Sequence, residues 1–457
     1  MATHPHNIAS LRIMTELPSK IKLAPGDYFM LAQDLWMRRS GLQGNICCAI
    51  LQLDKGFDVE RLRRRLTESP LMDWLARARA VRPLPFLPPV WRTNSKPGQI
   101  FFEHDDKDGT MENPWTPPEV VTRHQLRADR EPGVAFDVLR HADGTSHLFF
   151  SWNHTHLDAT GVDFILHHLS SNSDSNGSSS VKDFINPKQI KGLPISKWVT
   201  NADFAHTSMK WLDESGKEPL FTPAPPGPRS KARKNHQRRI LFTEEETARI
   251  AERCGKIAPG FRRSHFYLAA SIQAMHAIAG QRGQKDGAYL IPVPHDTRKY
   301  GAKGPIFSNH LSVLFYRVEA QQAASVRDIV GELGRQMTNQ IRDKFPEACM
   351  AALNMFKLIP PGYYVKHLGK PTRGKIASLS FSDSGEACRG MKEFCGARIM
   401  DVTHLIACWS LPGFTTLFLQ FGGRLSIVMS WVDDCISLPE ADGVERDLRR
   451  VLLEQEL

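Results

Sequence analysis

Patterns typical of strands and of helices alternate along the whole chain of 457 residues. Short apolar or β-branched runs predict strands, and runs with apolar residues three and four apart predict helices. Asp58 stands at an N-cap position, and Thr243 with Glu246 has the spacing of a capping box. The predicted strands are Ile46–Leu53, His147–Trp152, Arg239–Phe242, Leu290–Val293, Leu311–Val318, Ala377–Ser382, Thr415–Phe421 and Leu425–Trp431, and the predicted helices are Asp58–Leu66, Val162–Leu169, Thr243–Arg253 and Ser264–Ile278. This order predicts an α/β (α+β) fold in which helices pack on mixed sheets.

One segment near the middle of the chain interrupts these patterns. Thr222–Arg239 reads TPAPPGPRSKARKNHQRR, in which prolines stiffen the first half and Lys and Arg charge the second. Such a segment is typical of a crossover linker. It predicts an N-terminal lobe over residues 1–221, a Pro-rich and basic linker over 222–239, and a C-terminal lobe over 240–457. A second interruption, Leu169–Ser180, is rich in Ser and Asn and predicts a loop.

The charge balance favours anionic partners, because 59 Lys and Arg face 49 Asp and Glu and give a net charge of +10. We do not expect nucleic acid among them, since no RNA-reading run, zinc-finger spacing or leucine-zipper pattern occurs. Eight cysteines without a CxxC pair predict neither a disulfide scaffold nor a structural zinc. The most apolar stretch, His404–Phe421, is broken by Pro412 and Gly413 and predicts two strands around a turn. The beginning of the sequence lacks a continuous apolar core, so we expect a soluble, cytoplasmic protein.

The segment Ser151–Leu169, SWNHTHLDATGVDFILHHL, concentrates the groups that could do chemistry. His154 follows a predicted strand and opens a turn, a position from which a side chain projects into a cleft. Because imidazole titrates near neutrality, His154 could accept a proton from an alcohol, an amine or a thiol. Asp158, four residues later, could fix the backbone of the turn or hold the tautomer of the ring. The alternative is a histidine that only satisfies hydrogen bonds at the end of a strand.

Other chemistries fit the sequence less well. His154, His156 and Asp158 would share one face of an extended strand and could bind a metal. We nevertheless expect no metal, because the HxxxD spacing already accounts for two of the three residues. GKPTRGKI is not a phosphate-binding loop, since Ile376 stands where Ser or Thr should bind magnesium.

The segment Asn153–Ala159 resembles the HHxxxDG signature of the thioester-dependent acyltransferases. This superfamily includes wax-ester synthase and diacylglycerol acyltransferase-like enzymes, nonribosomal peptide condensation domains and chloramphenicol acetyltransferase. His154 and Asp158 match the second His and the Asp of the signature, whereas Asn153 replaces the first His and Ala159 the Gly. Further segments resemble blocks of the same superfamily and extend the likeness over nearly the whole chain: Pro25–Leu35 (PGDYFMLAQDL), Ile291–Val318, Ser378–Gly385 (SLSFSDSG) and Phe414–Trp431.

The resemblance implies two chloramphenicol-acetyltransferase-like lobes, each a mixed sheet with packed helices, and an active-site tunnel between them. The thioester donor would enter this tunnel from one face and the acceptor from the other. His154 would deprotonate the acceptor, which then attacks the thioester carbonyl. Asp158 would be structural and would pair with Arg298 in the other half of the chain. The alternative for Arg298 is a solvated cation in the charged loop HDTRKYGAKG. The expected oxyanion or substrate contacts are Asn153, Ser380 and Ser382.

We therefore expect an acyltransferase that takes its acyl group from a coenzyme A thioester, needs no other cofactor, and acylates a small-molecule or lipid alcohol or amine. A freestanding condensation-type enzyme that uses a carrier-protein thioester is the first alternative. A non-catalytic module of the same fold that binds an acyl carrier or a lipid is the second. The basic run Arg229–Arg239 is either a solvated linker or a contact for the phosphates of coenzyme A or for an acidic carrier protein. We expect a monomer that could touch a membrane surface.

Overall fold

The computed structural model describes residues 17–84, 87–106, 113–170, 184–186, 188, 196–217, 219–225, 233–260, 263–284, 286–298, 307–409 and 411–454. Most of the predicted loop Leu169–Ser180 lies outside these residues, and so does the centre of the predicted linker, residues 226–232. Within the described ranges no helix is long and apolar enough to cross a membrane.

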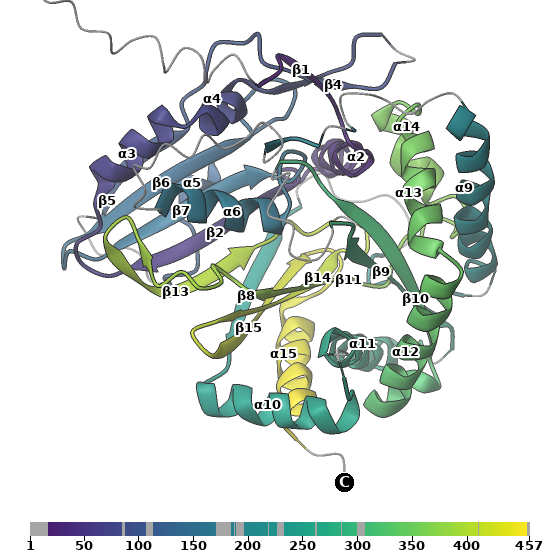
Figure 1. The fold of residues 1–457 in the computed structure, drawn as a ribbon. Helices are drawn as coiled ribbons and strands as arrows, with labels where there is room; N and C mark the ends of the chain where they lie inside the picture. Colours follow the sequence, from purple (N-terminus) through teal and green to yellow (C-terminus); the bar gives the residue numbers. More distant parts are fainter. Residues whose placement is uncertain are drawn as a thin grey trace, which may run out of the picture.

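The N-terminal lobe is built on a six-stranded mixed sheet, the largest sheet in the described part of the chain. Its strands follow the order β12-β13-β2-β7-β6-β5. Their bounds are β2 (Ile46–Leu53), β5 (Phe101–Asp106), β6 (Val134–His141), β7 (Ser146–Asn153), β12 (Glu393–Phe394) and β13 (Ala397–Leu405). One face of the sheet is covered by α3 (Val59–Glu68), α4 (Pro70–Arg77) and α6 (Ala159–Ser170), as Figure 1 shows.

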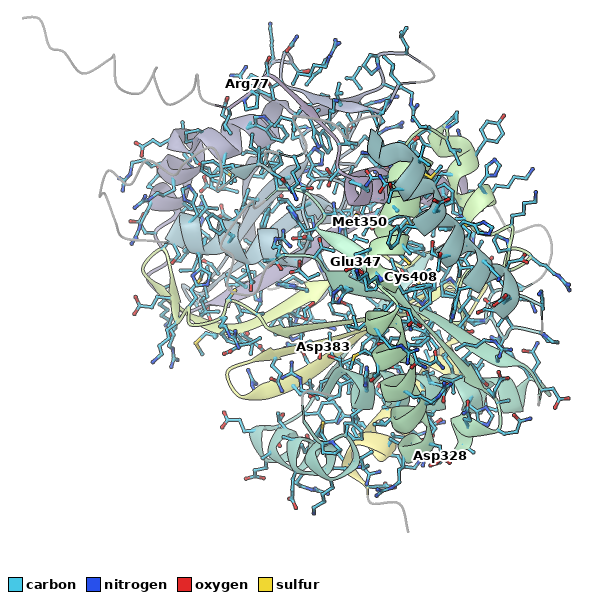
Figure 2. All side chains as sticks on the ribbon, turned by 45° about the vertical axis from the view of Figure 1, so that its right-hand side comes forward. Arg77, Asp328, Glu347, Met350, Asp383 and Cys408 are labelled. Atoms are coloured by element: carbon cyan, nitrogen blue, oxygen red, sulfur yellow. The ribbon has the colours of Figure 1, made fainter. Side chains whose placement is uncertain are left out.

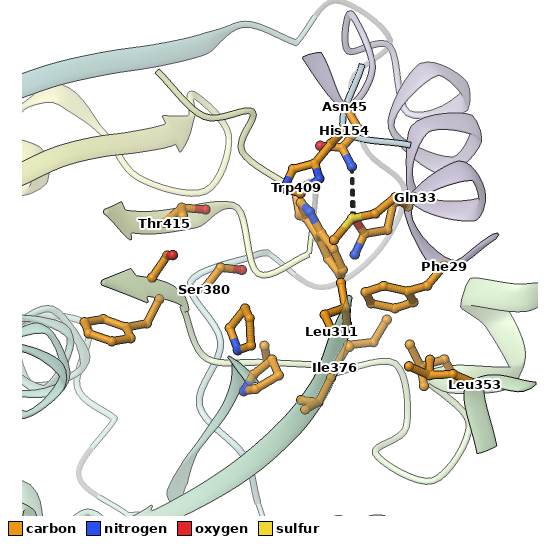
Figure 3. Close-up of a pocket in the computed structure, with 18 of the residues that line it drawn as sticks. Phe29, Gln33, Asn45, His154, Leu311, Leu353, Ile376, Ser380, Trp409 and Thr415 are labelled. Atoms are coloured by element: carbon orange, nitrogen blue, oxygen red, sulfur yellow. Dashed lines mark hydrogen bonds between the residues drawn. The ribbon is translucent and has the colours of Figure 1, made fainter. Parts of the chain in front are cut away.

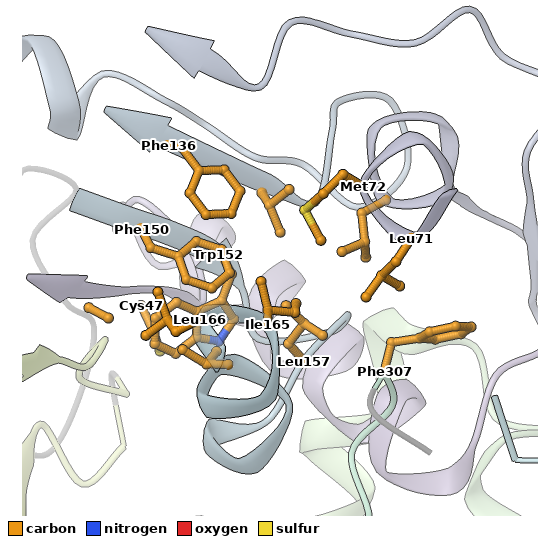
Figure 4. Close-up of a cluster of buried hydrophobic side chains, with 14 of the residues drawn as sticks. Cys47, Leu71, Met72, Phe136, Phe150, Trp152, Leu157, Ile165, Leu166 and Phe307 are labelled. Carbon is orange, nitrogen blue, oxygen red and sulfur yellow. The ribbon is translucent and has the colours of Figure 1, made fainter. Parts of the chain in front are cut away.

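The apolar sides of these elements form the core of the lobe. Phe150 and Trp152 of β7 lie against α6, whose Ile165 and Leu166 are fully buried (Figure 4). Such residues alternate along a strand and recur at three or four positions along a helix, which is why the sequence predicts both elements. Each fully buried side chain of this kind stabilises the fold by about 1.5–3 kcal/mol. This packing fixes the end of β7, where His154 follows.

The C-terminal lobe contains a four-stranded sheet in the order β11-β14-β15-β8 and an antiparallel pair, β9 and β10. The bounds are β8 (Asn235–Leu241), β9 (Ala288–Asp296), β10 (Leu311–Glu319), β11 (Ser380–Glu386), β14 (Phe414–Phe421) and β15 (Arg424–Val432). The helices are α9 (Ser196–Ser215), α10 (Glu244–Ile257), α11 (Arg263–Gln281), α12 (Val326–Arg342), α13 (Phe345–Phe356), α14 (Pro361–Leu368) and α15 (Leu438–Leu453). Figure 1 shows α9 and α13 side by side at the right edge of the molecule, with α14 above α13 and with α10, α11, α12 and α15 below.

Helix α2 (Pro25–Arg39) lies between the N-terminal sheet and the helices α13 and α14, which it contacts (Figure 1). A small three-stranded sheet has the strand order β1-β4-β3. β1 comes before α2 in the chain, and β3 and β4 come after it. The remaining short elements are β1 (Lys20–Lys22), β3 (Arg79–Val81), β4 (Val90–Arg92), α5 (Glu119–Thr122) and the 3-10 helix η1 (Gln322–Ala324). Because α2 lies between the two lobes, it packs against both of them.

Two strands, β12 and β13, cross the predicted division of the chain. β13 belongs to the second half of the sequence, but it pairs antiparallel with β2, where His404 lies opposite Ala49. Part of the predicted linker is also a strand, because residues 235–239 belong to β8, which pairs with β15. An extended charged segment can join a sheet because its backbone groups need partners as any others do. The lobe boundaries themselves stay a prediction.

The described arginines of the basic run make ion pairs within the chain. Their partners are Asp434 for Arg233 at 2.7 Å, Asp442 for Arg238 at 2.7 Å and Asp401 for Arg239 at 3.0 Å. The side chains of Arg233 and Arg239 are almost completely buried. These three arginines are therefore engaged within the fold, whereas Lys234 between them is exposed.

Predictions that depend only on neighbouring residues in the sequence are confirmed. β2 has the predicted bounds, Asp58 accepts the Arg61 N–H at 2.8 Å, and Thr243 forms the predicted capping box. The prediction Ala377–Ser382 is displaced, because β11 begins only at Ser380. Ser378 instead donates its N–H to Leu290 of β9 at 2.7 Å, which takes this segment out of the β11 strand. The α/β (α+β) fold with two lobes is confirmed.

Candidate active site

His154 is the first residue after β7, and its side chain lines a cavity between the lobes (Figure 3). Its backbone N–H donates to the carbonyl of Asn45 at 2.9 Å and fixes the start of the turn. The cavity has a volume of about 220 Å³ and draws its walls from both lobes, among them α2, α9, α13, β10 and β11. The imidazole therefore faces an internal space large enough for part of a substrate.

Asn309, which the sequence analysis did not single out, sets the tautomer of His154. Its side-chain amide donates to the carbonyls of His154 and Thr155 at 2.8 and 3.3 Å. Its side-chain oxygen therefore faces Nδ1 of His154, 3.0 Å away. Since a ring nitrogen that meets an amide oxygen must donate, Nδ1 carries the proton and Nε2 the lone pair. Burial lowers the pKa of His154, so the ring is neutral at pH 7.

A buried carboxylate, Asp27, holds Asn309 in turn. Asp27 lies in the first turn of α2 and accepts the backbone N–H of Asn309 at 2.7 Å and its side-chain amide at 3.2 Å. Gly26 allows this approach, because a Cβ there would lie 2.3 Å from the carbonyl oxygen of Asn309. Burial raises the pKa of Asp27 to about 6, although its hydrogen bonds oppose the shift. Asp27, Asn309 and His154 form one hydrogen-bonded chain.

Ser308, beside Asn309, has a φ of 122°, a conformation that residues with a Cβ rarely adopt. Its backbone N–H donates to the carbonyl of His156 at 3.0 Å, and its hydroxyl donates to Asp27 at 3.3 Å. Several contacts thus hold an unfavourable backbone conformation next to the group that orients His154. Strain maintained in this way is common at functional sites.

We expect the stability of the wild-type protein to fall relative to that of an Asp27→Asn variant as the pH rises from about 4 to about 6. The folded state keeps a proton on Asp27 up to a pH of about 6, whereas an unfolded chain releases it near the ordinary value of 3.8. This difference corresponds to about 3 kcal/mol once both states are ionised. Chemical unfolding of both proteins across this range measures it. A difference in unfolding free energy that does not change with pH would contradict the raised pKa.

Asp158 and Arg298 form a bidentate ion pair with distances of 2.8 and 3.0 Å. Their side chains are 17% and 6% exposed, so the pair is largely shielded from water. Asp158 also accepts the N–H of Gly161 at 2.9 Å, as the cap of α6, and the N–H of His310 at 3.2 Å. The structure thus contains the predicted contact between the HxxxD turn and the second half of the chain. Asp158 fixes the backbone of the turn, whereas Asn309 holds the tautomer.

No protein-family model matches this chain, and no curated protein does. Solved structures do match. The TRI3 trichothecene 15-O-acetyltransferase from Fusarium sporotrichioides has a TM-score of 0.69 at 12% identity, over 95% of both chains. The first condensation domain of the CDA synthetase has a TM-score of 0.67 at 12% identity, over 95% of this chain and 96% of that chain. The epimerization domain from the third module of tyrocidine synthetase B has a TM-score of 0.62 at 12% identity, over 96% and 97%.

The chain has the condensation-domain fold. The likeness spans nearly the whole length of both this chain and its structural neighbours. It confirms the predicted two-lobed, chloramphenicol-acetyltransferase-like architecture. At 12% identity it establishes the fold, and the chemistry has to be argued from the residues of this chain.

Within this condensation-domain fold, two of the three expected substrate contacts line the cavity, namely Ser380 and Ser382. Asn153 instead makes hydrogen bonds within the protein. Its side-chain amide donates to Asp34 at 3.1 Å, and its oxygen accepts the Thr155 N–H at 2.9 Å. Because Asn153 is fully buried and its polar atoms are paired, the geometry favours a role in supporting the turn.

The metal interpretation depended on His154 and His156 facing the same space. The ring of His156 lies against Trp91, with ring centroids 4.3 Å apart, and packs over Gly133, where a Cβ would come within 2.5 Å of the ring. His154 instead turns its Nδ1 toward Asn309. In the parts of the chain that are described, no group of three or more His, Cys, Asp or Glu could hold a metal ion.

Further polar residues of the cavity, among them Ser384 and His404, are also absent from the predicted site. The sequence does contain weak signals for some of the missed residues. Asn309 lies within Ile291–Val318 and Asp27 within Pro25–Leu35, two segments that resemble blocks of the acyltransferase superfamily. His404 carries no such signal, because its position in a strand reads like that of any buried residue.

Proposed function

We propose that this protein transfers an acyl group from a thioester to a hydroxyl or an amine, with His154 as the general base. The observation that carries the proposal is the neutral imidazole of His154, whose Nδ1 is engaged by Asn309 and whose Nε2 can accept a proton. The condensation-domain fold supports it, since an acetyltransferase and condensation domains have the same fold.

In the proposed reaction, Nε2 of His154 takes the proton of the acceptor while the acceptor oxygen or nitrogen bonds to the thioester carbonyl carbon. The π electrons of the carbonyl move onto its oxygen, where Ser380 or Ser382 is the proposed hydrogen-bond donor. The carbon–sulfur bond then breaks, and the leaving thiolate takes the proton back from His154. His154 is neutral again at the end of the cycle, so the reaction consumes only the thioester and the acceptor.

The other residues of the turn support this base without reacting. We propose that the Asp158–Arg298 pair holds the turn that aims His154, because it joins the two halves of the chain beside the cavity. Asp27 supports His154 indirectly, because it fixes the amide of Asn309, which in turn bonds to His154. These are positioning residues, because each acts through another group.

Coenzyme A is the proposed carrier of the acyl group, and a carrier protein is the alternative that the condensation-domain fold supports. The test incubates the purified protein with acyl-coenzyme A and, separately, with the same acyl group on a carrier protein. Release of free thiol is followed with and without candidate alcohols and amines. Turnover restricted to the carrier thioester would assign a condensation-type enzyme. Binding of acyl thioester without turnover in every combination would assign a non-catalytic module.

The acid limb of the pH profile of kcat/KM should have its midpoint below about 6.5, the ordinary pKa of histidine. Burial lowers the pKa of His154, so the ring stays neutral, and able to accept a proton, in mildly acidic solution. Initial rates with an acceptor that does not itself titrate between pH 5 and 8 measure this limb. A midpoint above the ordinary value would show that the group being titrated is not a buried histidine.

A further inference from the structure

Three serines form a row along one side of β11. Ser380 and Ser382 alternate along the regularly paired part of the strand, so their side chains leave it on the same face, about 6.6–7 Å apart. Ser384 follows where the pairing with β14 shifts register between Asp383 and Glu386. All three line the cavity that His154 also lines. We call these three residues the serine row.

The opposite face of β11 explains why the serine row points into the cavity. Phe381 is buried in the core of the C-terminal lobe, with its ring 5.7 Å from that of Phe418. Asp383, labelled in Figure 2, accepts the hydroxyl of Ser264 in α11 at 2.6 Å. The two residues between the serines therefore anchor the strand to the lobe and leave the serine side to the cavity.

The hydroxyls of the serine row make no hydrogen bond within the described part of the chain. Other hydroxyls of the same cavity are used by the protein: Ser208 donates to the Ala205 carbonyl at 2.9 Å, and Thr372 donates to the Gly369 carbonyl at 3.4 Å. The three serines of the row are partly exposed, so water can reach their hydroxyls, and a ligand that enters the cavity can take the place of this water.

His404 is a fourth polar residue in the lining of the cavity. It is 3% exposed, and its Nε2 has no hydrogen-bond partner among the described residues. Burial lowers its pKa to about 4, so the ring is neutral and offers one donor and one acceptor. A buried imidazole that the protein leaves unpaired is costly unless a ligand or water completes it.

Apolar side chains form the wall opposite the serine row. Figure 3 shows Phe29, Leu353 and Ile376 on one side of the cavity, with Ser380 and Thr415 on the other. Phe29 comes from α2 and Leu353 from α13, so this wall belongs to different elements from β11. The cavity is therefore amphipathic, with a mainly apolar wall on one side, interrupted by Gln33 of α2, and the serine row on the other.

We propose that the acceptor is a molecule with an apolar skeleton and further oxygen functions along one edge, and that the serine row with His404 recognises those oxygens. This inference rests on the proposed acyl transfer and adds the class of the acceptor. A hydroxyl can both donate and accept, so the row suits hydroxyl, carbonyl and ether oxygens alike. The apolar wall receives the skeleton and contributes affinity through buried area.

The test compares two acceptors that share one apolar skeleton and one reactive hydroxyl, of which only one carries additional hydroxyl or carbonyl groups. Their dissociation constants are measured by calorimetry without thioester, and their kcat/KM values with one acyl thioester. The wild-type protein should bind and acylate the oxygenated acceptor better. Ser382→Ala should reduce this preference by about 2- to 10-fold, the effect of one neutral hydrogen bond, and a variant with all three serines replaced by alanine should remove it.

Ser208→Ala is the matched control, because it removes a cavity hydroxyl that is already paired within the chain. It should leave the ratio between the two acceptors unchanged. The melting temperature of the serine-row variants should stay near that of the wild type, because no hydrogen bond inside the described structure is lost.

Two results would overturn the inference. One is an equal loss of affinity for both acceptors in Ser382→Ala, measured as dissociation constants without thioester, because the proposed oxyanion role of Ser382 would lower the rate but would not change these constants. The other is a change confined to the KM of the thioester, which would place the donor along the row. A third result would separate the two proposals. If the protein shows no turnover but still binds the oxygenated acceptor more tightly, the proposed acyl transfer is rejected and the recognition site is kept.

Discussion

Replacing His154 with alanine should lower the rate of acyl transfer by about 10²- to 10⁴-fold, the usual worth of general base catalysis. The chain should still fold, because His154 lines a cavity rather than the core of either lobe. Thiol release by the purified variant measures the rate, and thermal unfolding measures the melting temperature. Transfer at the wild-type rate by a folded His154→Ala protein would reject the mechanism.

Thr155→Val provides the matched control for this experiment. Thr155 is the next residue in the turn, it is fully buried, and its hydroxyl has no hydrogen-bond partner among the described residues. Valine keeps the shape of the side chain and removes only that unpaired hydroxyl, so both stability and rate should be retained. A rate loss in Thr155→Val as large as that in His154→Ala would show that the turn, and not the imidazole, determines the rate.

Breaking the Asp158–Arg298 pair should lower the unfolding free energy by about 3–5 kcal/mol in each single alanine variant, and should lower the rate as well. Both side chains are largely shielded, so the residue that remains keeps a charge in a poorly solvated place. Arg298 would then retain only its longer contact with the half-exposed Asp296, at 3.5 Å. Replacing both residues removes both charges, and the double variant should recover part of the stability. Chemical unfolding of the two single variants and the double variant gives the coupling energy.

The exposed pair of Arg342 and Asp343 is a suitable comparison, because its side chains are 69% and 59% exposed. Arg342→Ala should leave the unfolding free energy almost unchanged, because solvent screens an exposed pair. Strictly additive losses for Asp158→Ala and Arg298→Ala would mean that the contact between them does not contribute. A loss no larger than that of Arg342→Ala would have the same meaning.

The features that the sequence predicts best depend on neighbours within one or two turns. The bounds of β2, the cap at Asp58 and the capping box at Thr243 follow from spacings of two to four residues. β11 was misplaced because Ser378 bonds to β9, and no pattern within the segment reports that partner. Part of the predicted linker became β8 for the same reason, since its partner β15 lies far along the chain.

The residues of the candidate site also divide into those that local sequence patterns predict and those that depend on distant parts of the chain. His154 and Asp158 are visible in the sequence because a strand, a turn and a helix place them four residues apart. Arg298 was expected only through the resemblance to the acyltransferase superfamily, and the structure contains its pair with Asp158. Asn153 was expected to contact substrate, but its polar atoms are taken by the turn and by α2.

The sequence by itself determined the α/β elements, the turn that carries His154 and the residue type that can accept a proton there. Only the tertiary structure decided which nitrogen of His154 is free, because that depends on Asn309, 155 positions away. It also decided that Asp27 orients Asn309 across 282 positions, and that the serine row and His404 face the cavity unpaired. The physical reason is that periodicity along the chain sets which face of an element a residue occupies, whereas tautomer, burial and pairing depend on what the rest of the fold places opposite that face.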